Sequence, residues 1–161
     1  MALGIFLILV ASATSQGATG GASMPPNGGA SAPQPQANGN DSSGALRLAQ
    51  AKLGLPVTGI ASAAANRSVA MRMPAALATW YGPGFYGRRT ACGSVLRRST
   101  IGVAHRRLPC GTQVVFYYRG IFEAVPVIDR GPYARGSSWD LTAAAARGLG
   151  LRQTARLRVV P

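Results

Sequence analysis

The chain has 161 residues, which leaves room for one domain of ordinary size plus appended segments and excludes a second large domain. Its 17 Lys and Arg residues against 4 Asp and Glu residues give a net charge of +13, which suits nucleic acid, anionic lipid or acidic wall polymers as partners. All but one of the basic residues are Arg, so a genome-wide bias towards Arg explains the charge equally well and the charge alone selects no partner.

The N-terminus carries a short apolar run, residues 2–10, followed by the small residues Ala11, Ser12 and Ala13. This pattern predicts a signal peptide over residues 1–13 and export of the chain. A membrane-spanning helix needs about 20 apolar residues, so we expect no stable membrane span. No Lys or Arg precedes the run, and a buried N-terminal helix is the alternative.

The next two segments differ in composition. Residues 14–44 are rich in Gly, Ser, Ala and Pro and predict a disordered linker, because they cannot bury enough apolar surface to offset chain entropy. Within residues 45–75, Leu46 and Ala49 stand at helical spacing and Gly54 ends the run, which predicts a short helical spacer. The stretch "AQAKLGLPVTG" faintly resembles part of a small helical peptidoglycan-binding module, but the segment is too short for that module's core.

Residues 76–161 read as a compact, mainly β domain. Strands are predicted at 77–81, at 154–160 and on both sides of a turn at Arg119 and Gly120 within residues 112–128. A single short helix is expected in "TAAAARGLG", with Asp140 or Thr142 as its N-cap.

The two cysteines, Cys92 and Cys110, lie eighteen positions apart. In an exported protein they predict a disulfide that closes this loop and contributes on the order of 3 kcal/mol of stability. The alternative is a metal or nucleophilic site with His105, although these spacings match no recognised zinc pattern. We expect no metal and no cofactor.

Four motifs occur in a specific order: "ATWYGPGFYGRRTACG", "GVAHRRLPCGTQV", "VPVIDRGPYARG" and "WDLTAAAARGLG". Together they resemble the rare lipoprotein A family of double-psi β-barrels, which is similar to the expansin barrel. The resemblance covers about residues 77 to 160 and implies a six-stranded pseudo-symmetric barrel with a groove across one face. It also implies a secreted or cell-envelope location and engagement of peptidoglycan glycan strands. Paired cysteines at these places resemble the actinobacterial branch of the family.

The resemblance also implies site residues. Asp129 and His105 match functional positions, and Asp140 matches the Asp of the expansin "DLS" motif. A lytic transglycosylase needs a carboxylic acid that protonates the departing glycosidic oxygen while the 6-hydroxyl of the sugar attacks, so Asp129 and His105 are the candidate catalytic residues. An acid needs a raised pKa, and Asp140 is the candidate second carboxylate that would oppose the pull of Arg130 on Asp129.

The candidate glycan-binding residues are Thr79, Trp80, Tyr81, Tyr133 and Asp140. Structural alternatives stay open for the candidate residues: Asp129 as a turn acceptor, Asp140 as a helix cap, His105 as a residue at a strand end, and the aromatics as core. Aromatic side chains in Gly-rich loops nevertheless suit sugar stacking.

One position departs from the family pattern. Transglycosylases of the family carry a Glu in the first loop where this chain has Ser94, and serine cannot act as a general acid. We therefore expect a monomeric module that binds or remodels peptidoglycan glycan strands or other acidic wall polymers, with an active lytic transglycosylase as the alternative. Nucleic-acid binding is a third hypothesis, which would explain the charge but neither the export signal nor the acidic groove, so we expect no nucleic-acid partner.

Overall fold

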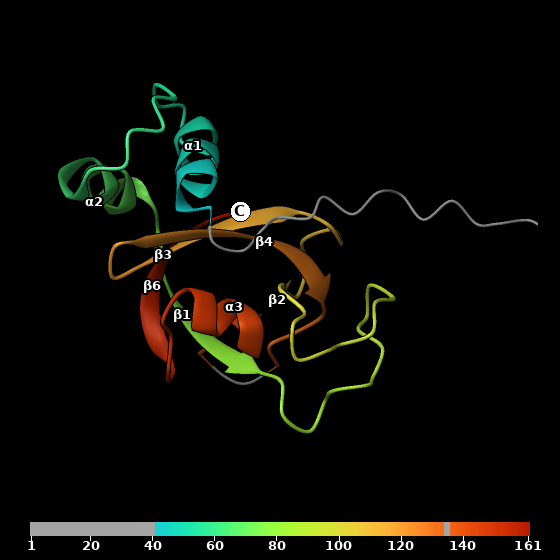
Figure 1. Cartoon of the computed structure of the whole chain (residues 1–161). Coiled ribbons are helices and arrows are strands. Elements are labelled where there is room, and N and C mark those ends of the chain that lie inside the picture. The colour runs from blue at the N-terminus through green and yellow to red at the C-terminus, as the bar shows by residue number, and fades with distance from the viewer. Residues whose placement is uncertain (1–40, 134–135) are drawn as a thin grey trace, which may run out of the picture. The chain divides into compact units, whose positions relative to one another are not determined.

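Six strands close into a barrel in the part of the chain that the structure, a computed structural model, describes: residues 41–133 and 136–161 (Figure 1). The strands are β1 Ala75–Tyr81, β2 Val103–Ala104, β3 Gln113–Tyr118, β4 Ile121–Asp129, β5 Trp139–Thr142 and β6 Ala155–Val160. Around the barrel they follow the order β1-β5-β2-β4-β3-β6, with parallel pairing of β1 with β5 and of β2 with β4. The six-stranded mainly β fold expected from the sequence is confirmed.

The hairpin between β3 and β4 forms where the sequence predicts it. Arg119 and Gly120 have φ angles of 47° and 95°, so both central residues of the turn are left-handed. A two-residue turn of this kind matches the right-handed twist of the flanking strands, and Gly adopts the conformation without steric cost. The hairpin then pairs continuously from Tyr118↔Ile121 to Gln113↔Pro126.

The barrel interior is filled by apolar side chains that alternate along the strands. Alternation follows from the period of two in a β-strand, which sends neighbouring side chains to opposite faces. The buried cluster includes Ala78, Val103, Val114, Phe116, Val125, Val127, Trp139, Leu141, Leu157 and Val159. The residues between them, among them Thr79, Ala104 and Asp140, therefore belong to the outer face.

Three helices lie in the described residues: α1 Ser42–Lys52, α2 Ala63–Arg72 and α3 Ala143–Gly148. The sequence predicted one helix in the barrel domain, and a short helical spacer over residues 45–75 before it. The helix α3 is the predicted one, and it begins after Thr142, whose hydroxyl accepts from the Ala145 amide at 3.3 Å. Asp140 belongs to strand β5 and is not the N-cap.

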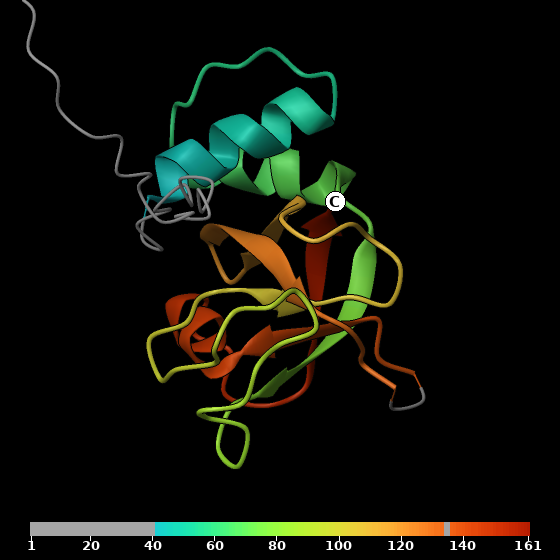
Figure 2. The same cartoon turned by 90° about the vertical axis from the view of Figure 1, so that its right-hand side faces the viewer.

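The helices α1 and α2 pack together on one side of the barrel (Figure 2). Leu46 and Ala49 of α1 are fully buried in a second cluster with Val115, Phe122 and Met73. The helix α1 begins at Ser42, inside the segment expected to be a linker, because the Asp41 side chain caps it by accepting from the Ser43 and Gly44 amides. The segment interpreted as a spacer thus packs against the outer face of β3 and β4.

The predicted signal peptide, residues 1–13, and the linker up to residue 40 lie outside the described residues. Within the described ranges, no helix has the length and apolar character needed to cross a membrane.

Candidate functional site

Four residues form one row across the outer face of the barrel. In the strand pairing Thr79 stands opposite Asp140, and Asp140 stands opposite Ala104. A register shift between Val103 and Ala104 then places Asp129, rather than Ile128, opposite Ala104. Residues opposite one another in paired strands point to the same side of a sheet, and two strand spacings place the Cα atoms of the two Asp residues about 10 Å apart. The row therefore brings the two carboxylates onto one face, with the small side chain of Ala104 between them.

Both oxygens of the Asp129 carboxylate accept hydrogen bonds. Oδ1 accepts from the backbone amides of Ala91 and Arg130, each at 2.8 Å, and Oδ2 accepts from the Tyr81 hydroxyl at 3.3 Å. The Ala91 contact ties Asp129 to the loop that contains Ser94. Asp129 thus combines a turn-acceptor role with a half-buried place in the outer row.

Asp140 is half-buried and has a different environment. Burial raises its pKa above the ordinary value, the hydrogen bond from Thr79 lowers it, and the negative charge of Asp129 raises it further. The Thr79 hydroxyl is 2.7 Å from Asp140 Oδ1 and also 3.3 Å from the Trp139 carbonyl. Asp140 therefore keeps its proton to a higher pH than an ordinary Asp carboxyl does.

The Tyr81 hydroxyl interacts with the negative charges of both Asp129 and Asp140. Burial raises the pKa of its hydroxyl, and the charges of Asp129 and then Asp140 raise it further. The phenol therefore stays protonated and acts as a hydrogen-bond donor. Tyr81 and Thr79 alternate with Trp80 along β1, so both face the carboxylates.

His105 follows Ala104 and is joined to Asp129 through the backbone, its amide donating to the Asp129 carbonyl at 3.1 Å. Its ring stacks on Trp139 with a centroid distance of 4.3 Å. Nδ1 accepts from the amides of Leu108 at 3.0 Å and Arg107 at 3.3 Å, which leaves the proton of the neutral ring on Nε2. Burial and the nearby guanidinium groups, that of Arg130 first, lower its pKa.

The disulfide predicted between Cys92 and Cys110 is confirmed, with Cα atoms 5.7 Å apart. It fastens the first loop beside the row, since the Cys92 amide donates to the Ile128 carbonyl at 3.2 Å. The Arg130 guanidinium donates to Cys110 Sγ and to the carbonyls of His105 and Asp129. Arg130 therefore braces the backbone around Asp129.

Two of the predicted aromatic residues lie apart from the carboxylates. Trp80 points to the opposite side of β1, 40% exposed, and lines a separate cleft beside α3, because neighbouring residues of a strand face opposite ways. Tyr133 is 80% exposed in the loop after Asp129. Of the predicted glycan-binding residues, Thr79, Tyr81 and Asp140 therefore lie together, whereas Trp80 and Tyr133 lie elsewhere.

Ser94 is exposed, and its hydroxyl lies 2.9 Å from the Thr90 hydroxyl. It belongs to the same loop as Ala91, whose amide donates to Asp129. Sequence reasoning missed Ser137, a buried residue whose hydroxyl bonds to the Trp139 carbonyl at 3.0 Å and lies 3.4 Å from the Thr79 hydroxyl. No periodic signal marks Ser137, and only its position three residues before Asp140 could have suggested a role.

Within residues 41–133 and 136–161, no three His, Cys, Asp or Glu side chains gather in a way that could hold a metal ion. The outer face presents carboxylates, hydroxyls and backbone amides.

The barrel sequence is similar to a family model and to several known proteins. Residues 73–160 match the family described as lytic transglycolase. The chain is 42% identical over 85 residues to a probable endolytic peptidoglycan transglycosylase RlpA of Synechocystis, covering 52% of this chain and 26% of that protein. It is 46% identical over 76 residues to the corresponding protein of Aquifex aeolicus, covering 46% of this chain and 34% of that protein. The chain thus spans about a quarter to a third of the length of these relatives.

Among solved structures, a Clavibacter michiganensis expansin matches with 22% identity and a TM-score of 0.44, covering 55% of this chain and 49% of that one. The Streptomyces papain inhibitor matches with 25% identity and a TM-score of 0.43, covering 55% of this chain and 94% of the other. The family match covers more than half of this chain and contains all six barrel strands, both cysteines and the row from Thr79 to Asp129. The chain belongs to the lytic transglycolase family of double-psi β-barrels.

Proposed function

We propose that this domain binds glycan strands of peptidoglycan at the cell envelope, along the outer row formed by Thr79, Asp140 and Asp129 and by the neighbouring Tyr81. The observation that carries the proposal is the row itself, in which two half-buried carboxylates share one face. The family match and the relatives named peptidoglycan transglycosylases support this polymer as the ligand.

The row suits hydroxyl-rich ligands for a chemical reason. A carboxylate offers about four lone-pair sites, and a sugar presents several hydroxyl donors. Asp140 accepts one side-chain hydrogen bond among those of the described residues, from Thr79, so acceptor capacity remains for a ligand. Hydrogen bonds to charged groups contribute about 1.5 to 3 kcal/mol each, which makes two fixed carboxylates a strong anchor for a glycan.

Binding rather than cleavage is the better-supported activity. Asp129 already accepts hydrogen bonds from three donors, which engage both of its carboxyl oxygens in holding the loop and Tyr81 in place. Ser94, in the first loop, supplies no proton and so cannot be the general acid that glycosidic cleavage needs.

A second candidate function is weak lytic transglycosylase activity with Asp140 as the acid. Its specific support is the raised pKa of Asp140, caused first by burial and then partly by the charge of Asp129. In this reaction the Asp140 proton passes to the glycosidic oxygen, the bond from that oxygen to C1 breaks, and the 6-hydroxyl of the same sugar bonds to C1. The 6-hydroxyl passes its proton to the Asp140 carboxylate, which restores the acid. The departing sugar keeps the glycosidic oxygen as a hydroxyl, and the other product is a 1,6-anhydro sugar.

Co-sedimentation with peptide-free peptidoglycan tests the binding proposal. We expect both Asp140→Asn and Tyr81→Phe to weaken binding. The effect of Asp140→Asn should be about tenfold or more, because it removes a charged hydrogen-bond acceptor. Tyr118→Phe is the matched control, because Tyr118 lies on β3 away from the row. Equal binding by all three variants would rule the row out as the glycan site.

Product analysis in the same samples separates the two functions. Release of 1,6-anhydro sugars by the wild type, abolished in Asp140→Asn, would establish cleavage with Asp140 as the acid. Binding without product would establish the binding module.

A further inference from the structure

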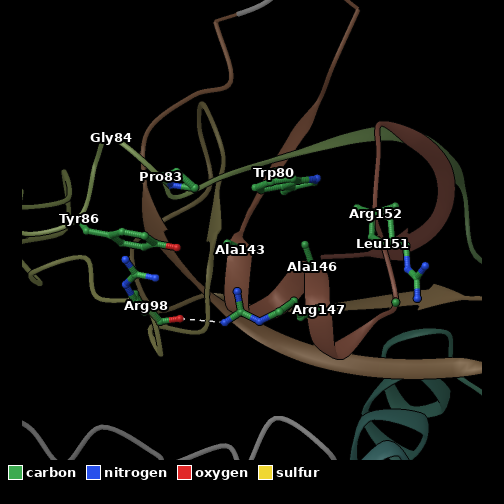
Figure 3. Close-up of a pocket in the computed structure, with 11 residues that line it drawn as sticks. Trp80, Pro83, Gly84, Tyr86, Arg98, Ala143, Ala146, Arg147, Leu151 and Arg152 are labelled. Atoms are coloured by element: carbon green, nitrogen blue, oxygen red, sulfur yellow. Dashed lines mark hydrogen bonds between the residues drawn. The ribbon is translucent and has the colours of Figure 1, made fainter.

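A second cleft of about 990 Å³ opens on the other side of β1, between the start of the first loop and the helix α3 (Figure 3). We call it the Trp80–α3 cleft. Its lining residues are Trp80, Pro83, Gly84, Tyr86, Arg98, Ala143, Ala146, Arg147, Gly150, Leu151 and Arg152. The volume lies at the upper end of the range of small-molecule sites, about 300 to 1,000 Å³.

One wall of the cleft is aromatic and the facing wall is built from small residues. Figure 3 shows the Trp80 ring lying over Ala143 and Ala146 of α3, with space between them. At the end of this wall a Cβ on Gly82 would come within 2.7 Å of the Tyr86 hydroxyl and 2.9 Å of Ala143 Cβ. Glycine at this position lets the Tyr86 side chain approach the start of α3 and shape the cleft.

The charge of the cleft has a single sign. Arg98, Arg147 and Arg152 line it, and no Asp or Glu is among the lining residues. Arg147 Nη2 donates to the Arg98 carbonyl at 3.0 Å, and the Arg98 guanidinium lies 5.5 Å from the centre of the Tyr86 ring. These contacts hold two guanidinium groups on one side of the cleft, where they can pair with an anion.

The Trp80–α3 cleft is separate from the outer row. Thr79 and Tyr81 face the carboxylates, whereas Trp80 lies between them in sequence and faces α3. A ligand can therefore occupy either site independently.

We propose that the Trp80–α3 cleft binds an acidic saccharide. A pyranose ring stacks on the exposed indole face of Trp80, which is 40% exposed, and its carboxylate or phosphate pairs with Arg98, Arg147 or Arg152. A planar guanidinium matches the geometry of both anions, and the three arginines give the site its preference for negative charge. A neutral saccharide lacks the partner for these groups.

Carboxylates and phosphates both pair with guanidinium groups, so one probe carrying each anion is needed to tell the two kinds of acidic saccharide apart. A peptide-free peptidoglycan tetrasaccharide carries carboxylates on its lactyl groups, and a sugar–glycerol phosphate oligomer carries phosphodiesters. The tetramer of N-acetylglucosamine serves as a neutral probe of similar length, and a glutamate trimer serves as an acidic probe without a sugar ring.

NMR titration of the full chain provides a site-specific readout. The indole N–H signal of Trp80 reports on the cleft, while the ring signals of Tyr81, whose hydroxyl donates to Asp129, report on the outer row. We expect one of the two acidic saccharides to shift the Trp80 signal with an affinity at least about tenfold above that of the neutral tetramer. A shift confined to Tyr81 would favour the row and overturn the proposal for the cleft.

Arg98→Gln and Arg147→Gln should each weaken binding of the acidic saccharide by about tenfold or more. Arg97→Gln is the matched control, since Arg97 is an exposed neighbour that does not line the cleft. Circular dichroism of each variant establishes that the fold is kept. Trp80→Phe provides a second test and should also weaken binding, because the smaller ring offers less surface for stacking.

If the neutral tetramer bound as tightly as the acidic saccharides, the arginines would have no role in recognition. If the glutamate trimer bound as tightly as the acidic saccharides, the cleft would recognise negative charge and not a sugar. An unshifted Trp80 signal with all four probes at millimolar concentration would also overturn it.

Discussion

The Thr79 hydroxyl donates a 2.7 Å hydrogen bond to Asp140 Oδ1, and the two residues are direct partners in the parallel pairing of β1 with β5. The contact stabilises the charged carboxylate, while burial and the neighbouring Asp129 favour its neutral form. The protonation of Asp140 is thus set by its own burial, by Thr79 of β1 and by Asp129 of β4.

The first prediction uses the opposite signs of these influences. Thr79→Val should raise the pKa of Asp140, because it removes the donor that favours the charged form, and Asp129→Asn should lower it, because it removes the nearby negative charge. Titration of the Asp140 carboxyl carbon by NMR measures both shifts. Shifts of the same sign in the two variants would contradict this account of the site.

The second prediction concerns Glu123, which is 3% exposed inside the barrel wall. Neither of its buried oxygens has a hydrogen-bond partner among the described residues, and burial raises its pKa to about 8. Between the ordinary value of 4.5 and about 8 the folded chain keeps a proton that the unfolded chain releases. The free energy of unfolding should therefore fall as pH rises through this window, by about 1.4 kcal/mol per pH unit at most.

Urea denaturation between pH 6.5 and 8 tests this effect. His105 has an effect of opposite sign near pH 6.5, where the unfolded ring is half protonated and the lowered pKa of the folded ring disfavours the proton. This contribution is common to the wild type and to a Glu123 variant, so it cancels when their pH slopes are compared. Glu123→Gln should abolish the loss of stability and exceed the wild type in stability at pH 8. The same pH slope in wild type and variant would show that Glu123 does not titrate with folding.

The third prediction concerns the disulfide. The double substitution Cys92→Ser and Cys110→Ser opens a loop of 18 residues and should lower the free energy of unfolding by about 3 kcal/mol. Urea denaturation of the variant, with reduced wild type for comparison, measures the loss. An unchanged denaturation midpoint would mean that the bond contributes nothing to stability.

The fourth prediction concerns Ser94 and the missing acid. Because Ser94 is exposed in the loop that bonds to Asp129 through Ala91, Ser94→Glu should fold normally and place a carboxyl beside the row. A general acid contributes a factor of about 100 to 10,000, so release of 1,6-anhydro sugars from peptide-free peptidoglycan should rise by that order. Ser94→Gln, of similar size but without the proton, is the control, and equal yields from the two variants would rule out acid catalysis from this position.

The fifth prediction treats α1 as part of the folded unit. Leu46 is fully buried against Val115 and Phe122, so Leu46→Ala should cost about 2 to 5 kcal/mol in the free energy of unfolding of the whole barrel. Val57→Ala is the control, since Val57 is 55% exposed. A barrel transition unaffected by Leu46→Ala would mean that α1 unfolds independently.

The sequence alone determined the features that local pattern can encode. Alternating apolar residues placed β1, β6 and the hairpin of β3 and β4, and the turn residues Arg119 and Gly120 lie at the predicted position. The order of the four motifs identified the barrel family before any contact was known. The two cysteines likewise predicted the disulfide between Cys92 and Cys110.

Tertiary structure decided which residues stand together. The strands β2 and β5 are short and gain their hydrogen bonds from partners distant in the chain, so no local periodicity marks them. Asp140 became a strand residue rather than a helix cap because β5 pairs with β1 up to Thr142. The same pairing fixed the face of each β1 side chain, which sent Trp80 to the cleft beside α3 and Thr79 and Tyr81 to the carboxylates. Register and barrel closure are properties of the whole set of strands, and the sequence of any one strand contains neither.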